Sequence, residues 1–243
     1  MIRRLLPDPE ALDGSAGLEA AYDMGSGPCV RADFVTSLDG AIEIGGRSGG
    51  LGGAADRAAF MAMRAAADVI LVGAGTARAE NYGPVVLDAG ASDRRRNRGQ
   101  RASPRLAVVT ARGDLPGDMR MFAGSEPPVV ITTARGLDSD PDLAGRAEVA
   151  QCGDVAVDME LALGVLGAMG LARVLCEGGP ALLRSLLDRD LLDELCLTIS
   201  PVVAGPQHRR LSGEDPLEVP ARFRLLSLLE GDGMLLARYG RPS

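Results

Sequence analysis

Short apolar runs alternate with helical patterns through most of this chain. Residues 69–72 are four consecutive apolar residues, which suits a strand covered on both faces, as in a parallel sheet. Residues 29–36 alternate between apolar and polar positions, which predicts a further strand. The same reasoning predicts strands at residues 105–110, 128–133, 148–152 and 173–176, and helices at residues 56–67, 158–169 and 181–188.

The C-terminal part follows a different pattern. Residues 193–205 form a second β segment bounded by Pro and Gly, and residues 222–239 read as two strands. The Gly-Asp-Gly within residues 230–233 is a hairpin signal between those two strands. Alternating β and α units that end in a hairpin predict an α/β fold of three α/β/α layers. Its central sheet is expected to be mainly parallel, with an antiparallel edge.

Three further stretches complete the organisation. Residues 1–28 look like a peripheral N-terminal strap, and residues 29–243 look like a single domain. Residues 42–53 are rich in glycine, which predicts a mobile loop that approaches a ligand or covers a cleft. Residues 92–105 carry many arginines and are expected to be a solvated, structureless loop.

Composition narrows the possible partners. With 243 residues and 46% hydrophobic content, the chain can bury one substantial core. Aromatic residues make up only 3%, and the net charge is −7, which together disfavour a nucleic-acid binder. No run reaches membrane-spanning length, so we expect a small molecule as the partner and no membrane.

The inventory of reactive side chains excludes several mechanisms. All 26 basic residues are arginine, which excludes Schiff-base chemistry and a lysine general base. The single histidine, His208, is expected in a surface loop, and no G-x-S-x-G elbow accompanies it. The four cysteines are widely separated, so we expect no metal site, and free thiols suit the cytoplasm. The N-terminus lacks the apolar stretch of a signal peptide.

Two glycine turns follow predicted strands. Residues 72–76 read VGAGT, and residues 177–183 read EGGPALL and lead into a helix. Strand, glycine turn and helix let backbone N–H groups and a helix N-terminus face an anion such as a phosphate. The usual dinucleotide fingerprint would need a third glycine where Arg78 stands, so the common nicotinamide-binding fold is disfavoured.

Four motifs in order carry a family resemblance: TSLDG (residues 36–40), VGAGT, EGGPALL and DELCLTISPVVAG (residues 193–205). In these motifs the chain resembles the reductase domain of the riboflavin-biosynthesis deaminase/reductases, and most closely the stand-alone pyrimidine reductase-like proteins. The resemblance implies a dihydrofolate reductase-like fold, NADPH as cofactor, a homodimer, and activity like that of the 5-amino-6-(5-phosphoribosylamino)uracil reductase. The deaminase half of the family has no counterpart here, because the chain lacks H-x-E followed by P-C-x-x-C.

The resemblance also implies a cofactor site. The two glycine turns would hold the NADPH pyrophosphate, and two residues after residues 105–109 would meet the adenosine 2′-phosphate, for which a hydroxyl and a guanidinium are apt partners. The implied cofactor-binding residues are Gly73, Gly75, Thr76, Glu80, Thr110, Arg112, Gly178, Gly179, Pro180, Ala181, Leu182 and Leu183.

A substrate side follows from the same resemblance. Ser37, Ser48, Arg64 and Asn81 are the implied substrate-binding residues, and Asp39 and Glu177 the implied catalytic ones. Imine or carbonyl reduction needs a proton as well as a hydride, and a carboxyl group in a covered site can donate it. Asp39 ranks slightly ahead because glycine flanks its turn. Glu177 has a purely structural alternative, in which it accepts N–H bonds from its own turn.

Departures from the family pattern concern the substrate's phosphate. Ala41 stands where the family usually has a basic residue, and Glu80-Asn81-Tyr82 replaces Asp-Asp-Pro. Residues 85–87 lack the family's downstream basic residue. Loss of positive charge weakens the binding of a dianionic substrate.

Several functions therefore stay open. The leading hypothesis is an NADPH-dependent oxidoreductase that acts on a C=N or C=O group of a pyrimidine- or pterin-like molecule. The alternatives are a catalytically weak NADPH-binding paralogue and a flavin- or deazaflavin-dependent oxidoreductase. Residues 195–204 fit either a dimer seam along an exposed strand edge or the core.

Overall fold

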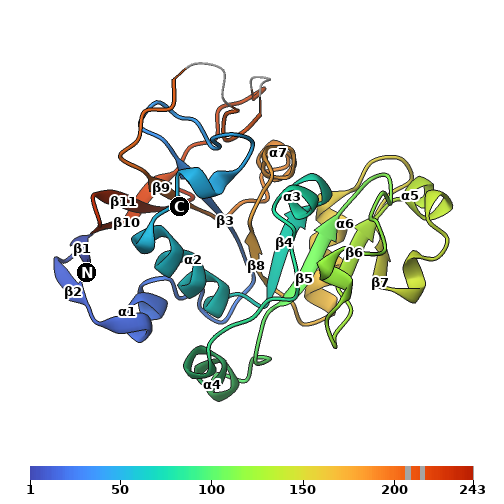
Figure 1. Cartoon of the computed structure of the whole chain (residues 1–243), viewed down its shortest axis with the longest axis horizontal. Coiled ribbons are helices and arrows are strands. Elements are labelled where there is room, and N and C mark those ends of the chain that lie inside the picture. Colours follow the sequence, from blue (N-terminus) through green and yellow to red (C-terminus); the bar gives the residue numbers. More distant parts are fainter. Residues whose placement is uncertain (206–208, 214–216, 243) are drawn as a thin grey trace.

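One sheet runs across the molecule, from β2 at one end to β7 at the other (Figure 1). The computed structural model describes residues 1–205, 209–213 and 217–242, so the prediction for His208 lies outside the described residues. Among the described residues the sheet has 11 strands in the order β2-β1-β10-β11-β9-β3-β8-β4-β5-β6-β7. In chain order these are β1 (Ile2–Leu6), β2 (Glu10–Leu12), β3 (Cys29–Thr36), β4 (Val69–Gly73), β5 (Arg105–Val109), β6 (Val129–Thr132), β7 (Glu148–Gln151), β8 (Arg173–Cys176), β9 (Glu194–Ile199), β10 (Arg224–Gly231) and β11 (Met234–Gly240).

Seven helices and three short 3₁₀ turns join the described strands. The helices are α1 (Gly14–Ala21), α2 (Ala54–Ala66), α3 (Ala74–Ala79), α4 (Ala89–Asn97), α5 (Ala134–Ser139), α6 (Met159–Ala168) and α7 (Pro180–Asp188), and the 3₁₀ turns are η1 (Ser48–Gly50), η2 (Arg120–Phe122) and η3 (Leu143–Gly145). The strands predicted at residues 29–36 and 173–176 have the predicted bounds, and the other predicted elements shift by a few residues at their ends.

Strand directions confirm the predicted mixed sheet. From β9 through β3, β8, β4, β5 and β6 to β7, every neighbouring pair is parallel. β11, β10, β1 and β2 add an antiparallel end. Asp232 and Gly233 both have positive φ, of 54° and 76°, which is the geometry of the predicted hairpin turn between β10 and β11.

Helices cover both faces of the sheet, which confirms the three layers. In β4, Ile70 and Val72 pack in one hydrophobic cluster with α1, α2 and α3. Val69 and Leu71 point the other way and pack in a second cluster with α6 and α7. All four side chains are fully buried, as a continuous apolar run in a parallel strand predicts.

Residues 1–28, expected as a peripheral strap, supply β1, β2 and α1 at the antiparallel end. Leu18 and Tyr22 are buried in the same cluster as α2. The fully buried Arg31 on β3 donates to the Tyr22 carbonyl oxygen at 2.6 Å and forms an ion pair with Glu194 at 2.6 Å. This segment is therefore joined to the sheet by a buried guanidinium as well as by strand pairing.

The structure corrects the prediction of a structureless loop at residues 92–105. α4 occupies residues 89–97, and the Asp88 side chain caps it by accepting a hydrogen bond from the Ala91 N–H at 2.8 Å. The helix was missed because its sequence has almost no apolar positions from which a helical period can be recognised.

Arginines of α4 cap the end of α2. The buried Arg95 donates to the carbonyl oxygens of Ala65 and Ala67, and Arg98 donates to the Ala65 carbonyl oxygen at 3.0 Å. Carbonyls in the last turn of a helix have no partner within the helix, so these bonds satisfy them. Both arginines thus bind backbone carbonyls, while the buried Nη2 of Arg95 has no hydrogen-bond partner among the described residues.

The structure also decides between the alternatives for residues 195–204. β9 pairs with β3 on one side and with β11 on the other, so it is no exposed sheet edge. Cys196 is buried in the core. The prediction of a subunit contact along an exposed strand edge is therefore wrong, and the alternative, that this strand belongs to the core, is confirmed. In the described part of the chain, no helix is both long and apolar enough to span a bilayer.

Candidate active site

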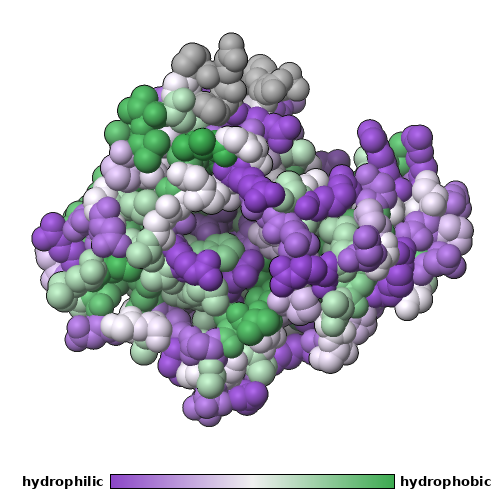
Figure 2. All heavy atoms as spheres, viewed as in Figure 1, coloured by the Kyte–Doolittle hydropathy of each residue, from purple (hydrophilic) through white to green (hydrophobic). Residues whose placement is uncertain are grey.

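A cleft of about 890 Å³ opens at the carboxyl ends of β3, β4 and β8. α2 and the glycine-rich loop of residues 42–53 form one wall, and α3 with residues 80–86 forms the other. The space-filling view shows the molecule hollowed at this place, with hydrophilic side chains around the opening (Figure 2). Open α/β sheets place their ligands at this end of the strands.

The two predicted glycine turns touch each other in this cleft. Because β4 and β8 are neighbours, the Gly73 N–H donates to the Gly178 carbonyl oxygen at 2.8 Å. Gly178 has a φ of +91°, and the Gly178–Gly179 peptide bond is cis. A Cβ added at Gly179 would lie 2.6 Å from Thr76 Oγ1, so a side chain there would force the turn or that hydroxyl to move. Gly75, Thr76, Gly179 and Pro180 all line the cleft.

Glu177 forms the best-defined polar contact at the cleft floor. Arg64 of α2 donates from Nε to Oε1 and from Nη2 to Oε2, both at 2.7 Å. The Tyr82 hydroxyl donates to Oε2 at 2.6 Å. The Glu177 side chain is 2% exposed. Its carboxylate thus binds Arg64 and Tyr82 rather than the N–H groups of its own turn.

Electrostatics stabilise the charged form of Arg64. Burial alone would lower the pKa of Arg64, but hydrogen bonds and charge attraction from Glu177 outweigh it and raise the pKa. The guanidinium also lies 4.1 Å from the centre of the Phe60 ring. Burial, and next the Glu177 charge, raise the pKa of the Tyr82 hydroxyl, so Tyr82 stays a donor.

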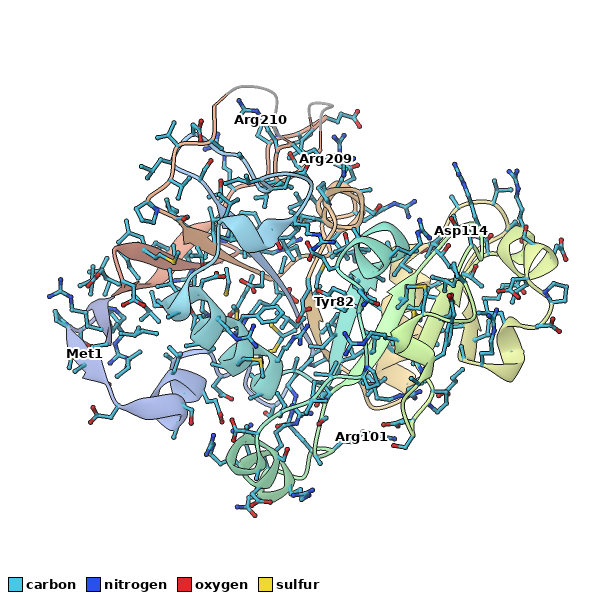
Figure 3. The ribbon with its side chains drawn as sticks, in the orientation of Figure 1. Met1, Tyr82, Arg101, Asp114, Arg209 and Arg210 are labelled. Carbon is cyan, nitrogen blue, oxygen red and sulfur yellow. The ribbon has the colours of Figure 1, made fainter. Side chains whose placement is uncertain are left out.

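Sequence reasoning brought Arg64 and Glu177 to one site but missed Tyr82. The residue was noticed only as a departure from the family pattern, and its position between α2 and α3 appears in the structure (Figure 3). Its placement follows from the end of α3. The Asn81 N–H donates to the Arg78 carbonyl oxygen and the Tyr82 N–H to the Ala77 carbonyl oxygen, which is the Schellman pattern.

Asn81, a predicted substrate residue, occupies the left-handed position of that motif. Its φ is 51°, a conformation that asparagine tolerates better than most residues. Asn81 lines the cleft and is exposed, so its side chain stands at the opening. The backbone role in ending α3 accounts for asparagine at this position.

Ser48 and Glu80 come together across the cleft wall. The Ser48 N–H and hydroxyl donate to Glu80 Oε1 at 3.2 Å and 3.4 Å. Both residues line the cleft. Sequence reasoning placed Ser48 with the substrate and Glu80 with the cofactor, whereas the structure shows them as one hydrogen-bonded pair that connects the glycine-rich loop to the end of α3.

The carboxyl groups of Asp33, Glu43 and Asp56 also line the cleft, and sequence reasoning missed all three. Asp33 lies on β3 and Asp56 in the first turn of α2. Burial, followed by repulsion from Asp56 and Glu177, raises the pKa of Asp33 well above its ordinary value. Burial also raises the pKa of Asp56, against a hydrogen bond from Thr198. Asp33 could have been noticed in the sequence, because it is an acid within a strand whose neighbouring positions are mostly buried.

Ser37 and Asp39 lie outside the residues that line the cleft. The Ser37 hydroxyl donates to Asp39 Oδ1, and the N–H groups of Ala204 and Gly205 donate to the same carboxylate at 3.1 Å and 2.7 Å. These hydrogen bonds, led by the one from Ser37, lower the pKa of Asp39 to about 2. A carboxyl group that is ionised at neutral pH and holds two loops together is a poor proton donor, which argues against the catalytic prediction.

Thr110 and Arg112, expected at the 2′-phosphate, follow the carboxyl end of β5, the strand beside β4, and lie outside the residues that line the cleft. The Thr110 hydroxyl donates to Asp114 Oδ1 at 3.0 Å. Arg78 forms an ion pair with Asp114 at 3.3 Å, at a point that Figure 3 shows beyond α3. The exposed Arg112 makes no side-chain ion pair with any described residue. The structure thus adds Arg78 and Asp114 to this corner.

α7 follows the second glycine turn, and its leucine side chains point into the core. Only the backbone of its first turn is therefore available to a ligand at the glycine turn. Pro180 occupies the first position of α7, where its missing N–H costs nothing. Ala181 is exposed, whereas Leu182 and Leu183 are buried in the core. The side chains of these two leucines belong to the core, so their contact with a cofactor would come from their backbone, and the predicted pyrophosphate site at this helix start stays a prediction. Within the described residues, no cluster of His, Cys, Asp or Glu has the makings of a metal site.

Comparisons with known proteins identify the family to which this chain is similar. The model of the RibD C-terminal domain family matches residues 28–236. The 2,5-diamino-6-ribosylamino-4(3H)-pyrimidinone 5′-phosphate reductase of Methanothermobacter thermautotrophicus is 29% identical over 203 residues, which are 82% of this chain and 90% of that protein.

Solved structures confirm the fold. A pyrimidine reductase-like protein from Corynebacterium diphtheriae is 28% identical, with a TM-score of 0.82 over 93% of this chain and 99% of that one. A dihydrofolate reductase from Enterococcus faecalis, complexed with NADP(H), is 12% identical, with a TM-score of 0.51 over 88% of this chain and 97% of that one. The dihydrofolate reductase-like fold expected from the sequence is confirmed.

Proposed function

The chain belongs to the RibD C-terminal domain family, and on that premise we propose that it is an NADPH-dependent reductase of a ribosylamino-pyrimidine phosphate. The curated relative carries that substrate in its name and spans nearly the same length. One observation carries the proposal. The touching glycine turns and the Arg64–Glu177 pair lie in one cleft, so a dinucleotide and a polar ring can meet there.

The cleft fits the proposed cofactor at the glycine turns. A Cβ at Gly179 would fill the space beside Thr76 Oγ1, and the absence of side chains at Gly75 and Gly179 leaves backbone open to a pyrophosphate. We propose that Arg112 meets the 2′-phosphate, which makes NADPH the preferred dinucleotide over NADH. Bound NADPH supplies the hydride.

The substrate side follows from the chemistry of the ribosylamino group. In its open-chain form this group presents a C=N bond, and reduction adds a hydride to carbon and a proton to nitrogen. A carboxylate has about four acceptor positions. Arg64 and Tyr82 occupy three of those on Glu177, which leaves one at Oε1 for an N–H donor of the pyrimidine.

A second candidate is a reductase of a pterin-like molecule that carries no phosphate. The cleft lining favours this candidate, because it has more acidic side chains than arginines without an acidic partner. Such a lining binds a phosphate dianion weakly. Arg64 is committed to Glu177, and Arg209 lies 3.9 Å from Glu43. The ionisable residues that line the cleft are the acids Asp33, Glu43, Asp56, Glu80 and Glu177 and the arginines Arg57, Arg64, Arg120 and Arg209.

Steady-state NADPH oxidation separates these candidates. The test uses the phosphorylated ribosylamino-pyrimidinone, its dephosphorylated form and dihydropterins, each with NADPH and with NADH. Turnover of the phosphorylated compound supports the proposal, and turnover of the pterins alone supports the second candidate. Tight NADPH binding without oxidation of any compound identifies a catalytically weak paralogue. Thermal protection by flavins but not by NADPH would point to a flavin-dependent enzyme instead.

We also propose a homodimer that works in the cytoplasm. Family resemblance supports the dimer, and the four free thiols support a reducing compartment. Leu38 and Val203, which are 62% and 71% exposed, are apolar positions for a subunit contact. Light scattering after size exclusion tests the dimer, and a monomer at micromolar concentration would rule it out.

A further inference from the structure

We propose that Asp33 is the catalytic acid, whose carboxyl group delivers the proton that the substrate nitrogen gains when the hydride reaches the neighbouring carbon. The inference rests on the proposed function and assigns a role that Asp39 and Glu177 were expected to share.

Strand pairing places Asp33 beside Glu177. Ala32 on β3 is in register with Cys176 on β8, so the next residues along the two parallel strands are Asp33 and Glu177. Both line the cleft, and Asp33 is half-buried there. Ala32 packs into the cluster on the opposite face, so alternation along β3 directs Asp33 toward α2 and the cleft. A ligand that contacts Glu177 therefore lies within reach of Asp33.

The surroundings give these two acids opposite roles. Glu177 takes both arms of Arg64 and the Tyr82 hydroxyl. Among residues 1–205, 209–213 and 217–242, none forms an ion pair or a side-chain hydrogen bond with Asp33. Arg31, the other guanidinium near Asp33, is committed to Glu194 and the Tyr22 carbonyl. The charge of Glu177 is therefore balanced by Arg64, whereas Asp33 has no such partner among the described residues.

Every neighbouring element contributes a titratable or charged group around Asp33. The groups are Tyr22 after α1, Arg31 on β3, Asp56 and Arg64 on α2, Cys176 and Glu177 at β8, and Cys196 on β9. Burial comes first, and then the negative charges of Asp56 and Glu177, in raising the pKa of Asp33. A carboxyl group that burial and neighbouring charges keep protonated can serve as a proton donor.

The proposed step balances in atoms and electrons. The hydride of the reduced nicotinamide forms a C–H bond at the carbon of the substrate C=N group, and the π electron pair moves to nitrogen. Asp33 gives its proton to that nitrogen and becomes a carboxylate. The substrate is reduced and the nicotinamide oxidised. The cleft is open to solvent, so water returns the proton to Asp33 after product leaves.

The other carboxyl groups fit this role less well. Asp39 is ionised at neutral pH and lies outside the residues that line the cleft. Glu177 is held in an ion pair. Asp56 shares a hydrogen bond with Thr198, which favours its charged form. Asp33 alone combines a place in the cleft with a carboxyl group free of partners among the described residues.

The first test is the pH dependence of kcat in the Asp33→Asn variant, with Asp56→Asn as the matched control. Loss of a general acid lowers kcat by about 10²- to 10⁴-fold. We expect that loss in Asp33→Asn, disappearance of the alkaline limb of the pH profile, and an NADPH Kd within about twofold of the unaltered protein. Asp56→Asn should keep the alkaline limb but shift it to lower pH, because it removes one of the charges that raise the pKa of Asp33. An Asp33→Asn variant that retains both kcat and its pH profile overturns the proposal.

The second test needs no turnover. Carbon-13 NMR of the unaltered protein with labelled aspartate carboxyls should show, besides the raised titration of Asp56, a second group that titrates well above the ordinary range and is absent from Asp33→Asn. If that variant does not fold, the titration of the unaltered protein decides, and the lack of this second raised group overturns the proposal. If the unaltered protein oxidises NADPH with none of the substrates, the proposed function is wrong. The NMR titration measures the pKa of Asp33 independently of that result.

Discussion

The Arg64 guanidinium and the Glu177 carboxylate face each other as two forks, with Nε–Oε1 and Nη2–Oε2 distances of 2.7 Å. This pair joins α2 to the end of β8, across 113 residues of sequence. Bidentate pairs of this kind combine energy with a fixed orientation. The pair therefore both holds the cleft floor together and sets the direction of the remaining acceptor position on Glu177.

Removing Arg64 should destabilise the protein as well as its substrate complex. Arg64→Ala leaves the buried Glu177 carboxylate without its cation, and breaking a buried pair in this way costs about 3 kcal/mol. Urea unfolding measures the loss. The matched control is Arg96→Ala, which breaks an exposed pair with Asp93 and should cost under about 1 kcal/mol. Equal losses in the two variants would show that Glu177 does not depend on Arg64.

The Tyr82 hydroxyl should contribute less. Tyr82→Phe deletes one hydrogen bond to a charged group, which is worth about 1.5–3 kcal/mol, and keeps the ring. A double-mutant cycle with Glu177→Gln, read by urea unfolding, isolates the coupling between the two residues. Additive effects would mean that the hydroxyl does not act through Glu177.

A methyl group at Gly179 should impair cofactor binding. In Gly179→Ala the new Cβ would stand 2.6 Å from Thr76 Oγ1, so the turn opens or the hydroxyl rotates away. We expect the Kd for NADPH, from titration calorimetry, to rise at least about tenfold, which corresponds to about 1.4 kcal/mol. Gly164→Ala is the control, because nothing lies within 4 Å of its Cβ position on α6. An unchanged Kd in Gly179→Ala would remove this turn from the cofactor site.

Arg112 should set the choice of dinucleotide. Its exposed guanidinium is free of ion pairs with the described residues, and a bond to a phosphate is charge-assisted. Arg112→Ala should therefore weaken NADPH binding about tenfold and leave NADH binding unchanged. Arg189→Ala, an exposed arginine after α7, serves as control. A parallel loss for both dinucleotides would show that Arg112 does not contact the 2′-phosphate.

Asp39 should influence stability through pH. Its folded-state pKa of about 2 lies below the ordinary 3.8, so its contribution is present above pH 3.8 and is lost as pH falls through 2. Asp39→Asn should therefore melt at a lower temperature than the unaltered protein at neutral pH, and the difference should close toward pH 2. Thermal unfolding followed by circular dichroism measures both.

The same variant decides the role of Asp39 in turnover. Because Asp39 holds the turn at Ser37 against the Ala204–Gly205 backbone, we expect kcat to stay near that of the unaltered protein. A loss of kcat by a hundredfold with an unchanged NADPH Kd would return Asp39 to the catalytic residues.

Local patterns predicted most of the fold because each pattern reflects a local cause. The apolar run at residues 69–72 needs two covered faces, and the Gly-Asp-Gly at residues 231–233 suits the positive φ values of a tight hairpin. α4 was not predicted, because the contacts that stabilise it are with residues far away in the sequence. Arg95 on that helix satisfies the carbonyl oxygens at the end of α2, and no hydrophobic period in its own sequence announces it.

The amino-acid sequence by itself determined the strands from β3 onward, the two glycine turns and the absence of lysine chemistry, since all of these depend on residue type and near neighbours. Only the tertiary structure decided which side chains meet. The order β3-β8-β4 brings together strands that are far apart in the chain, and so places Asp33 beside Glu177 and Gly179 beside Thr76. Folding also gave the acids different surroundings: Glu177 is in an ion pair, Asp39 binds loop backbone and Asp33 has no partner among the described residues. The protonation state of each acid depends on these surroundings, which the sequence alone does not show.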